Sequence, residues 1–239
     1  GKCTNQLTPE KVEALAGKVI VDVACGYKYT CAVTSTGSIY TWGSDGCGCS
    51  NKLLPTLLPD LSSKVVISVS GGYRFTACVT KAGEVFTWGH GYYGRLGHGD
   101  ERNQETPKRV DALVGVNAKE VSCGLYHTAV CTEDGHVYTF GLGENGQLGH
   151  GEKDNVSSPA LVHALEDKNI TQVQCGWYHS MALTSSGYVF TWGYAENGRL
   201  GHDSINSELK YLTIPCLVEG LREHNVVQMT GGPYHCVVI

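Results

Sequence analysis

Three short sequence blocks recur along the chain in a fixed order, and their spacing indicates a repeat architecture. The first block is Pro-x-x-apolar-x-x-Leu, the second is a glycine after a short apolar stretch, and the third is Gly-x-Val-Tyr/Phe-Thr-Trp-Gly with small variations. The blocks are marked by Pro9, Pro55, Pro107, Pro159 and Pro215, by Gly26, Gly72, Gly124, Gly176 and Gly232, and by the terminal glycines Gly43, Gly89, Gly141 and Gly193. In every copy, 17 residues separate the proline from the second-block glycine, and in the four copies that reach the terminal glycine it lies 17 residues further on.

The distance from a terminal glycine to the next proline is the variable one, at 12, 18, 18 and 22 residues. A fixed distance is typical of strand pairing, because one inserted residue would turn every following side chain to the other face of a sheet. A variable distance is typical of a surface loop. Each repeat therefore contains paired strands followed by one elastic loop.

The fixed segments have the composition of short strands and tight turns. β-Branched and aromatic residues fill 138–140, and 133–135 supplies the glycine of a hairpin. The proline segment at 106–109 has no room for a useful helix, so we expect a short strand and a turn there. Antiparallel strands are expected within 21–43, 67–89, 119–141 and 171–193, with no helix longer than about two turns.

About fifty residues with several short strands correspond to one blade of a β-propeller. We therefore predict an all-β fold, a β-propeller of four-stranded blades. The predicted division of the single propeller segment 1–239 is a repeat tail at 1–20, blades at about 21–66, 67–118, 119–170 and 171–225, and a partial repeat at 226–239.

The repeat resembles that of the regulator of chromosome condensation family, and the resemblance covers the whole chain. The best copy lies at 121–151, with Cys123-Gly124, His127, Thr132, Gly135, Val137-Tyr138, Phe140-Gly141 and the run Gly-Gln-Leu-Gly-His-Gly at 146–151. The first copy departs from the pattern, since its loop at 43–51 is shorter and lacks Leu-Gly-His. The resemblance implies a propeller of typically seven blades, of which about 4.6 repeats are present here.

Charge, hydropathy and cysteine placement limit the partners and the compartment. A net charge of −5 does not favour direct nucleic-acid binding. No apolar run is long enough to predict a membrane span, and the first residues do not have the pattern of a signal peptide. Cys25, Cys123 and Cys175 occupy a slot where other repeats have Gly71 and Gly231, which is typical of a small buried hydrophobe. We therefore expect all eleven cysteines to be unpaired, and the protein to be intracellular, in the cytoplasm or the nucleus.

Two glycine motifs and one cysteine pair could suggest a cofactor or a metal, and neither has the required context. The segments 89–94 and 141–146 match G-x-G-x-x-G, but a dinucleotide site needs a helix after the glycines, so we interpret them as turn glycines with positive φ. Cys47-Gly-Cys49 has no second Cys or His pair nearby to complete a zinc site. We therefore expect no metal and no small-molecule cofactor.

Six histidines recur in two repeat slots. His127, His179 and His235 share a slot with Tyr29 and Phe75, so we expect packing residues whose ring nitrogens form local hydrogen bonds. His98, His150 and His202 recur at intervals of 52, and we expect them to point outward from separate blades. Ligands of one metal must converge, so neither set predicts a metal site, and no nucleophile–base pair is present. The sequence therefore predicts a protein that is not an enzyme.

Aromatic and basic residues follow the second-block glycines and are expected to lie on one face. They are Tyr27, Lys28, Tyr73, Arg74, Tyr126, Trp177, Tyr178 and Tyr234, and Tyr92-Tyr93 stands out because sister loops have Glu-Asn at the same positions. One interpretation is packing between neighbouring blades. The other is a partner-binding face, because Tyr, Trp and Arg are enriched at interface hot spots. These ten residues are the candidate binding residues.

Three functions remain open from the sequence. The preferred one is a non-catalytic protein-interaction propeller, an adaptor or substrate-recognition module of a larger regulatory protein such as the HECT-type ubiquitin ligases. The resemblance also implies an alternative, a guanine-nucleotide exchange factor for a Ran-like small GTPase. The longest loop, at 194–214, is only four residues longer than its sisters, which does not favour a catalytic wedge. A light sensor like the family's plant UV-B photoreceptor would need clustered tryptophans, and Trp177 alone fills such a slot.

Overall fold

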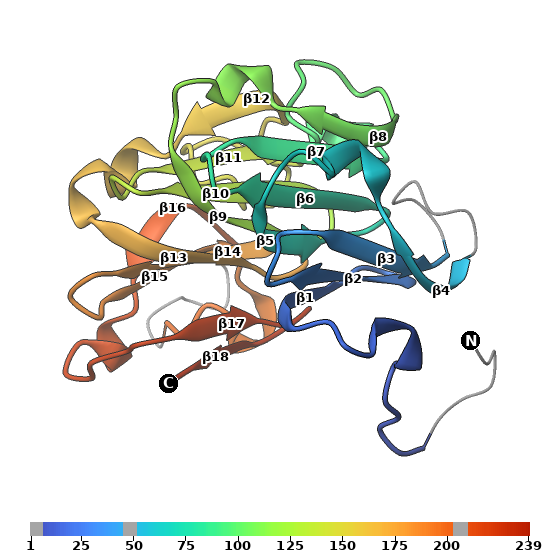
Figure 1. The fold of residues 1–239 in the computed structure, drawn as a ribbon. Helices are drawn as coiled ribbons and strands as arrows, with labels where there is room; N and C mark the ends of the chain where they lie inside the picture. Colours follow the sequence, from blue (N-terminus) through green and yellow to red (C-terminus); the bar gives the residue numbers. More distant parts are fainter. Residues whose placement is uncertain (1–6, 45–51, 203–209) are drawn as a thin grey trace.

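The computed structural model describes residues 7–44, 52–202 and 210–239. In it, four antiparallel four-stranded sheets follow one another along the chain, and a two-stranded sheet comes after them (Figure 1). Blade 1 contains β1 (Ile20–Cys25), β2 (Tyr29–Thr34), β3 (Ile39–Gly43) and β4 (Lys52–Leu57), and blade 2 contains β5 (Val66–Gly71), β6 (Phe75–Thr80), β7 (Val85–Gly89) and β8 (Gln104–Arg109). Blade 3 contains β9 (Ala118–Cys123), β10 (His127–Thr132), β11 (Val137–Gly141) and β12 (Val156–Leu161), and blade 4 contains β13 (Ile170–Cys175), β14 (His179–Thr184), β15 (Val189–Tyr194) and β16 (Tyr211–Leu217). The last sheet contains β17 (Met229–Gly231) and β18 (Cys236–Val238). The predicted all-β propeller architecture is confirmed.

Each blade is a meander in which strands adjacent in sequence are hydrogen-bonded neighbours. In blade 3, Thr128 of β10 pairs with Cys123 of β9 on one side and with Phe140 of β11 on the other. The hairpin between β10 and β11 turns at Gly135, whose φ of 84° explains the glycine. In each blade the first strand begins one residue before the range predicted from the 17-residue spacings. The second and third strands lie inside that range, except that β15 ends one residue after it.

The connections contain short 3₁₀ turns, and six residues is the greatest length among those described. They are η1 (Glu13–Leu15), η2 (Pro59–Leu61), η3 (Tyr92–Gly94), η4 (Asp111–Leu113), η5 (His163–Lys168), η6 (Glu196–Gly198) and η7 (Glu219–Leu221). The proline segment Gln104–Arg109 is β8, and η4 follows it, so the predicted strand and turn are confirmed. These connections leave no crossover helix between sheets in the part of the chain that is described.

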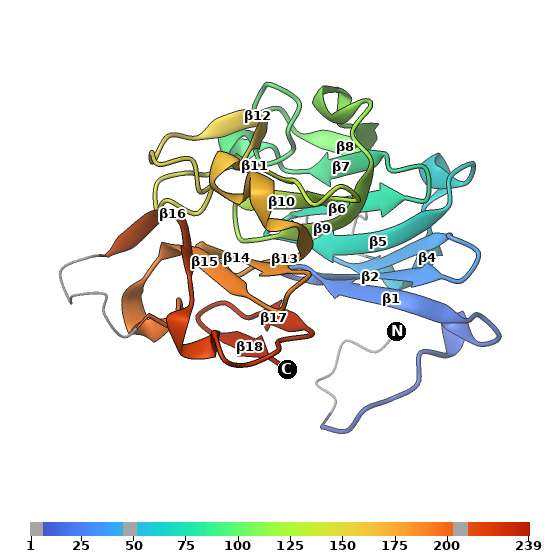
Figure 2. The same ribbon diagram turned by 90° about the vertical axis from the view of Figure 1, so that its left-hand side faces the viewer.

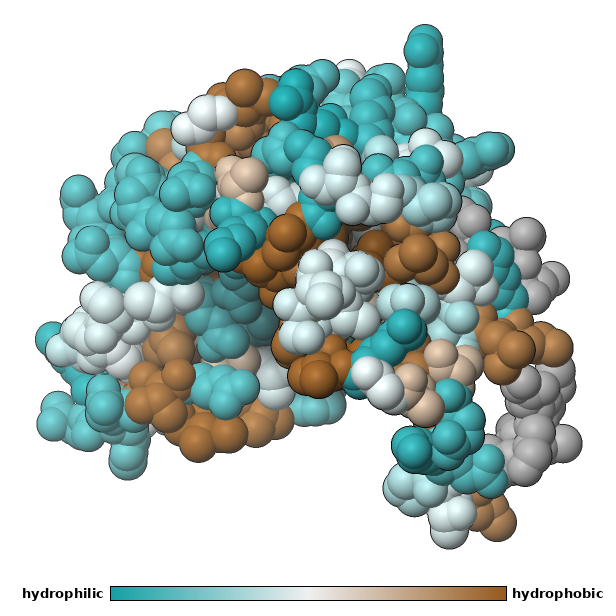
Figure 3. Space-filling view, in the orientation of Figure 1, coloured by the Kyte–Doolittle hydropathy of each residue, from teal (hydrophilic) through white to brown (hydrophobic). Residues whose placement is uncertain are grey.

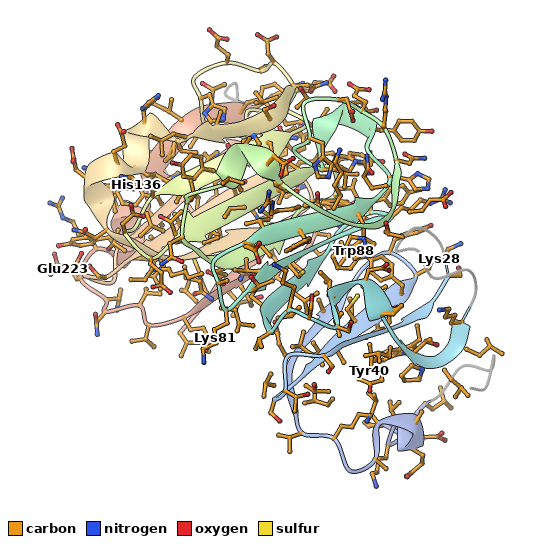
Figure 4. The ribbon with its side chains drawn as sticks, turned by 45° about the horizontal axis from the view of Figure 1, so that its top comes forward. Lys28, Tyr40, Lys81, Trp88, His136 and Glu223 are labelled. Carbon is orange, nitrogen blue, oxygen red and sulfur yellow. The ribbon has the colours of Figure 1, made fainter. Side chains whose placement is uncertain are left out.

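The blades are arranged around a centre, with their first strands inside and their fourth strands at the periphery (Figure 2). The hydrophobic clusters lie between neighbouring sheets rather than within one. Trp88 of blade 2 packs with Tyr29 and Ile39 of blade 1, and Trp192 of blade 4 packs with Cys131 of blade 3. Figure 4 shows Trp88 between the sheets of the first two blades. The third-strand aromatic of the repeat is therefore an inter-blade residue, and its burial holds successive blades together.

Polar side chains on the first strands connect each blade to the next. Ser70 Oγ accepts a hydrogen bond from the Cys123 amide at 2.9 Å, and Ser122 Oγ accepts one from the Cys175 amide at 2.9 Å. Glu120 accepts from the Val173 amide at 3.0 Å, and burial raises the pKa of its carboxyl above 4.5. Buried amides on the inner strands are thus paired across blades, which fixes the register of one blade against its neighbour.

The cysteines agree with the expectation of buried thiols only in part. Among the described residues no disulfide bond involves Cys25, Cys78, Cys123, Cys131, Cys175, Cys216 or Cys236, and the second-strand cysteines Cys31, Cys78 and Cys131 are buried. Burial raises the pKa of the Cys131 thiol to about 12. Cys25 and Cys216 are exposed, which corrects the expectation, because no described blade covers β1 and because β16 is an outer strand. Cys47 and Cys49 lie outside the described residues, as does Cys3.

Candidate functional site

The turn between the first and second strands of each blade is built around a glycine. At Gly72, a Cβ atom would lie 2.1 Å from the Phe75 ring, and at Gly124 it would lie 2.2 Å from the His127 ring. The turn folds back on the ring three residues later, so only glycine fits. The two residues between glycine and ring are thereby displayed at the end of the blade. These are the positions of the predicted aromatic and basic residues.

Successive inner turns are joined by backbone hydrogen bonds. The Tyr27 amide donates to the Gly72 carbonyl at 3.3 Å, the Tyr73 amide to the Leu125 carbonyl at 3.3 Å, and the Leu125 amide to the Trp177 carbonyl at 3.2 Å. The turns of all four blades and of the β17–β18 sheet line one central cavity of about 340 Å³. The equivalent turns therefore meet at one end of the propeller, around its axis.

The aromatic rings of these turns touch one another from blade to blade. Ring centroids lie 4.7 Å apart for Tyr27 and Tyr73, 5.6 Å for Tyr73 and Tyr126, and 6.4 Å for Tyr126 and Tyr178. Trp177 lies 5.1 Å from Tyr234. We call the ten candidate residues together the aromatic face.

The aromatic face keeps exposed surface despite these contacts. Tyr27 and Tyr234 are 53% and 52% exposed, and Tyr73, Tyr126, Trp177 and Tyr178 are half-buried. Inter-blade packing and an accessible surface therefore coexist in the same residues.

Tyr92 and Tyr93 extend the aromatic face outward from the loop of blade 2. Tyr92 is 55% and Tyr93 40% exposed, and the Tyr93 ring lies 5.4 Å from that of Tyr126. Tyr93 has a φ of 64°, a left-handed conformation that blade 4 gives to Asn197 at the same position. Because a tyrosine is less suited to this conformation than an asparagine, the sequence maintains a strained residue that contributes an aromatic ring to the face.

A buried arginine lies beneath the tyrosines and was not among the predicted site residues. Arg95 is 1% exposed, and its guanidinium carbon lies 4.6 Å from the centroid of the Tyr126 ring and 5.7 Å from that of Tyr93. Its Nη1 donates to the Tyr73 carbonyl at 2.9 Å and its Nε to the Tyr92 carbonyl at 2.8 Å. Burial lowers the pKa of Arg95 to about 10, while the surrounding tyrosines act in the opposite direction. The Arg95 guanidinium thus holds the loop by hydrogen bonds and the tyrosine rings by cation–π contacts.

Two further cations lie beside tyrosines of the same face. Lys28 Nζ is 5.3 Å from the centroid of the Tyr27 ring, and the Arg74 guanidinium carbon is 5.6 Å from that of Tyr73. Lys28 is exposed at the end of blade 1 (Figure 4). Arg74 is half-buried, with a φ of 62°. The part of the face over blades 1 and 2 is consequently aromatic and basic together.

The histidine slots differ from the sequence expectation in their partners. His127 is a packing residue, as expected, but its Nε2 lies 2.9 Å from Ser180 Oγ of the next blade, so the bond is not local. His98, His150 and His202 do not point outward: each Nε2 lies 2.9–3.0 Å from a threonine Oγ1 of its own third strand. The Leu-Gly-His loop folds back on the sheet, which a repeat interval cannot show.

The glycine motifs act as turns, as expected, but Gly91 does not have the expected positive φ, since its φ is −96°. Gly89 and Gly94 have φ of 107° and 75°, and the three-residue turn η3 is the helical element there. Gly91 instead allows a close approach, since a Cβ would lie 2.1 Å from the Arg102 carbonyl oxygen. No group of metal-ligating side chains is found among residues 7–44, 52–202 and 210–239.

Sheets of four antiparallel strands that pack side by side around an axis, with glycine-built inner turns, define a partial β-propeller. The RCC1-like domain family matches residues 1–238, and the chain belongs to this family. It is 35% identical over 94% of its length to human E3 ubiquitin-protein ligase HERC2, and 33% identical over 100% of its length to the Ultraviolet-B receptor UVR8 of Arabidopsis thaliana. The matches span 4% and 43% of those two proteins.

The fold also agrees with a solved structure of the family. Yeast RCC1 (Prp20) in its crystal structure with Kap60 superimposes with a TM-score of 0.79 at 20% identity, covering 93% of this chain and 54% of that one. This likeness concerns the fold alone. No helix of the described residues is long and apolar enough to cross a membrane.

Proposed function

We propose that this chain is a non-catalytic protein-interaction propeller, the recognition module or adaptor of a larger regulatory protein, and that the aromatic face binds its partner. The observation that carries the proposal is the exposure that the face keeps. Tyr92 and Tyr93 of blade 2 are 55% and 40% exposed while both contact the Arg95 guanidinium and Tyr93 contacts the Tyr126 ring. Tyrosine, tryptophan and arginine are enriched among the hot spots of protein interfaces.

The comparisons support a protein as the partner. HERC2 is by name a ubiquitin ligase, and yeast RCC1 is solved in complex with Kap60. By this analogy the partner is a ubiquitination substrate or an adaptor. The proposal includes no nucleic acid, membrane or small-molecule cofactor, in keeping with the net charge of −5. It also places the protein inside the cell, where buried thiols without a disulfide bond, such as those of Cys78 and Cys131, stay reduced.

Truncation of exposed rings tests the proposal with little disturbance of the fold. Tyr27→Ala and Tyr234→Ala remove side chains that are 53% and 52% exposed, so we expect a small change in melting temperature. If these rings are hot spots, each variant weakens binding to the purified partner about 30-fold or more, the equivalent of about 2 kcal/mol. Tyr188→Ala is the matched control, since Tyr188 is 39% exposed on a hairpin outside the face.

The partner is first captured from cell extract with the parent chain, identified, and then titrated against each variant by calorimetry. Equal affinity of the parent, Tyr27→Ala and Tyr234→Ala would refute a binding face at these turns. Trp177→Ala adds a separate test of packing, because loss of stability with retained affinity would assign that ring to inter-blade packing. Faster nucleotide release from a Ran-like GTPase on addition of the parent would favour the exchange-factor alternative instead.

A further inference from the structure

The guanidinium of Arg95 is buried without a counter-ion among the described residues. The side chain is 1% exposed, and its hydrogen bonds go to neutral main-chain carbonyls, those of Tyr73 and Tyr92. Burial lowers the pKa of Arg95 to about 10, so the group still carries its charge at pH 7. A buried charge is costly unless an opposite charge or polar groups compensate it. The surroundings of Arg95 therefore favour an anion that the described part of the chain does not supply.

Three tyrosine rings surround this cation. The Arg95 guanidinium carbon lies 4.6 Å from the centroid of the Tyr126 ring, 5.7 Å from that of Tyr93 and 5.9 Å from that of Tyr92. Within the described part of the chain, no hydrogen bond is formed by the hydroxyl group of any of the three. A phenol hydroxyl can donate a hydrogen bond to a carboxylate. The site therefore combines one central positive charge with neutral donors nearer the surface.

The sister loops of blades 3 and 4 lack this combination. In blade 3 the slot of Arg95 holds the neutral Gln147. Both sister loops have an exposed glutamate, Glu144 and Glu196, at the position of Tyr92. Blade 2 thus has the buried arginine and the aromatic rings, but not the carboxylate of its sisters.

The backbone at this end of blade 2 is unusual as well. Arg74, in the turn between β5 and β6, has a φ of 62°, and Tyr93 has a φ of 64°. Tyr126 and Tyr178, which occupy the position of Arg74 in blades 3 and 4, do not have a positive φ. Residues held in this conformation cost free energy, and they cluster at functional sites. The sequence therefore maintains two strained residues beside Arg95.

We propose that this end of blade 2 recognises a carboxylate of an acidic segment in the protein partner. The segment lies across Tyr92, Tyr93 and Tyr126, whose hydroxyls donate to an aspartate or glutamate side chain. Arg95 attracts this carboxylate from beneath the rings without touching it, because charges interact more strongly where water is excluded. Arg95 is thus a specificity-determining residue. The inference rests on the proposed function, since the site lies within the aromatic face.

An acidic protein segment fits this site better than a nucleic acid does. Nucleic-acid binding needs a basic surface that follows several phosphates, and the chain has a net charge of −5. One buried cation beneath three phenol groups is suited instead to a single carboxylate. The negative net charge also repels an acidic peptide elsewhere on the chain, so its binding reports a local positive site.

Hexaglutamate with blocked ends tests the site without the unidentified partner. It is titrated against the whole 239-residue chain at pH 7 and low salt, and NMR of isotope-labelled tyrosine follows the binding. Hexaglutamine with the same blocked ends is the neutral control peptide. Hydrophilic residues cover much of the side of the molecule seen in Figure 3, so charged peptides can also contact the chain elsewhere, and matched variants are needed.

Arg95→Gln removes the buried charge, and the slot accepts glutamine because Gln147 fills it in blade 3. Arg199→Gln is the matched control, since Arg199 occupies the same slot of blade 4, is 4% exposed, and has Glu196 in its loop at the position of Tyr92. The melting temperature of each variant is measured to establish that it is folded.

We expect hexaglutamate to bind the parent and Arg199→Gln with saturable shifts at Tyr92 and Tyr93. Hexaglutamine and the variant Arg95→Gln are each expected to show affinity about 10-fold lower or less. The double variant Tyr92→Phe, Tyr93→Phe keeps both rings and removes two donors, so it should also lose about 10-fold in affinity. This second variant tests the site even if Arg95→Gln does not fold.

Absence of saturable binding, equal affinity for the two peptides, or equal losses in the two arginine variants would overturn the proposal. Tighter binding of a six-nucleotide oligothymidylate than of hexaglutamate would assign the site to nucleic acid and would also overturn it. The proposed function fails separately. If hexaglutamate does not bind but Tyr27→Ala weakens binding of the partner, the carboxylate site is wrong and the binding face is kept. If hexaglutamate binds as expected but the truncations leave partner affinity unchanged, the carboxylate site is kept and the binding face at those turns is wrong.

Discussion

Acidification is expected to destabilise this fold through His127, and replacement of that residue isolates the effect. The imidazole is fully buried between blades 3 and 4. Ser180 donates its hydroxyl proton to the Gln147 carbonyl at 2.8 Å, so His127 Nε2 must donate to Ser180 Oγ. Its Nδ1 is then unprotonated and has no hydrogen-bond partner in the described residues. If the imidazole became charged, the added proton would sit on Nδ1 with no hydrogen-bond acceptor among the described residues.

Burial, with a smaller contribution from His179, lowers the pKa of His127 from 6.5 to about 3. Between these two pH values the unfolded chain binds a proton that the folded chain excludes. The stability from this group is therefore complete above pH 6.5 and decreases as the pH falls toward 3. At pH 5 the difference is about 1.5 pH units, or about 2 kcal/mol.

The substitution His127→Phe uses a residue that this slot already accepts, since Phe75 fills it in blade 2 and is fully buried. Ser180 keeps its bond to Gln147 in the variant. Urea denaturation followed by circular dichroism at pH 7 and pH 5 gives the free energy of unfolding of both chains. We expect the parent to lose about 2 kcal/mol more than His127→Phe between these two pH values.

The control for the loss of one histidine at an exposed position is His163→Gln, because the His163 side chain is 80% exposed. This variant should follow the parent at both pH values. If His127→Phe loses as much stability as the parent on acidification, then His127 is not held neutral by burial, and the reasoning from its environment is wrong.

Two further predictions concern the contacts between blades. Gly149→Ala should lower the free energy of unfolding, measured by urea denaturation, by about 1–3 kcal/mol more than Gly201→Ala does. Both glycines have positive φ (81° and 72°), but among the described residues only the Cβ at Gly149 would meet a third-strand ring, at 2.8 Å. Equal losses in the two variants would contradict this reasoning. Glu120→Gln should gain stability relative to the parent as the pH rises from about 4 to 7. Burial raises the pKa of Glu120 in the folded chain above its usual 4.5, so the folded parent holds a proton that the unfolded chain has already released. The free energy of unfolding of the parent therefore falls as the pH rises through the folded-state pKa. A difference that stays constant with pH would contradict it.

The fixed spacings were sufficient to predict the strands, because strand register is a local property of the sequence. The predicted range 119–141 contains β10, β11 and all of β9 except its first residue, Ala118. The turn at Gly135 and the alternation around Thr139 are readable without any tertiary contact. The burial of a side chain could not be predicted in the same way. Cys25 and Cys123 share one repeat slot, yet Cys25 is exposed and Cys123 is buried. Which neighbour covers a residue depends on the next blade and not on the residue's own repeat.

The candidate site shows the same division. Equivalent turns implied that Tyr27, Tyr73 and Tyr126 share one end of the fold, and their rings do touch in series. Arg95 was missed because a charged residue in a polar loop looks exposed in sequence. A signal was nevertheless present, since Arg95 and Arg199 occupy one slot of a glycine-rich loop where blade 3 has the neutral Gln147. A recurring arginine in a segment that otherwise varies in length indicates a buried anchor.

Several hydrogen bonds between the first two strands of neighbouring blades join nearly equivalent positions of successive repeats. Four residue pairs, including Ser122 with Cys175 and His127 with Ser180, are 53 residues apart, and three bonds between blades 1 and 2 span 46 or 47 residues. Each of these bonds joins one repeat to the next. Duplication or deletion of one complete repeat would therefore change these contacts only at the new junction and would leave those between the other repeats in place. A gene encoding such a chain can change its number of blades by unequal recombination while each junction keeps the same chemistry.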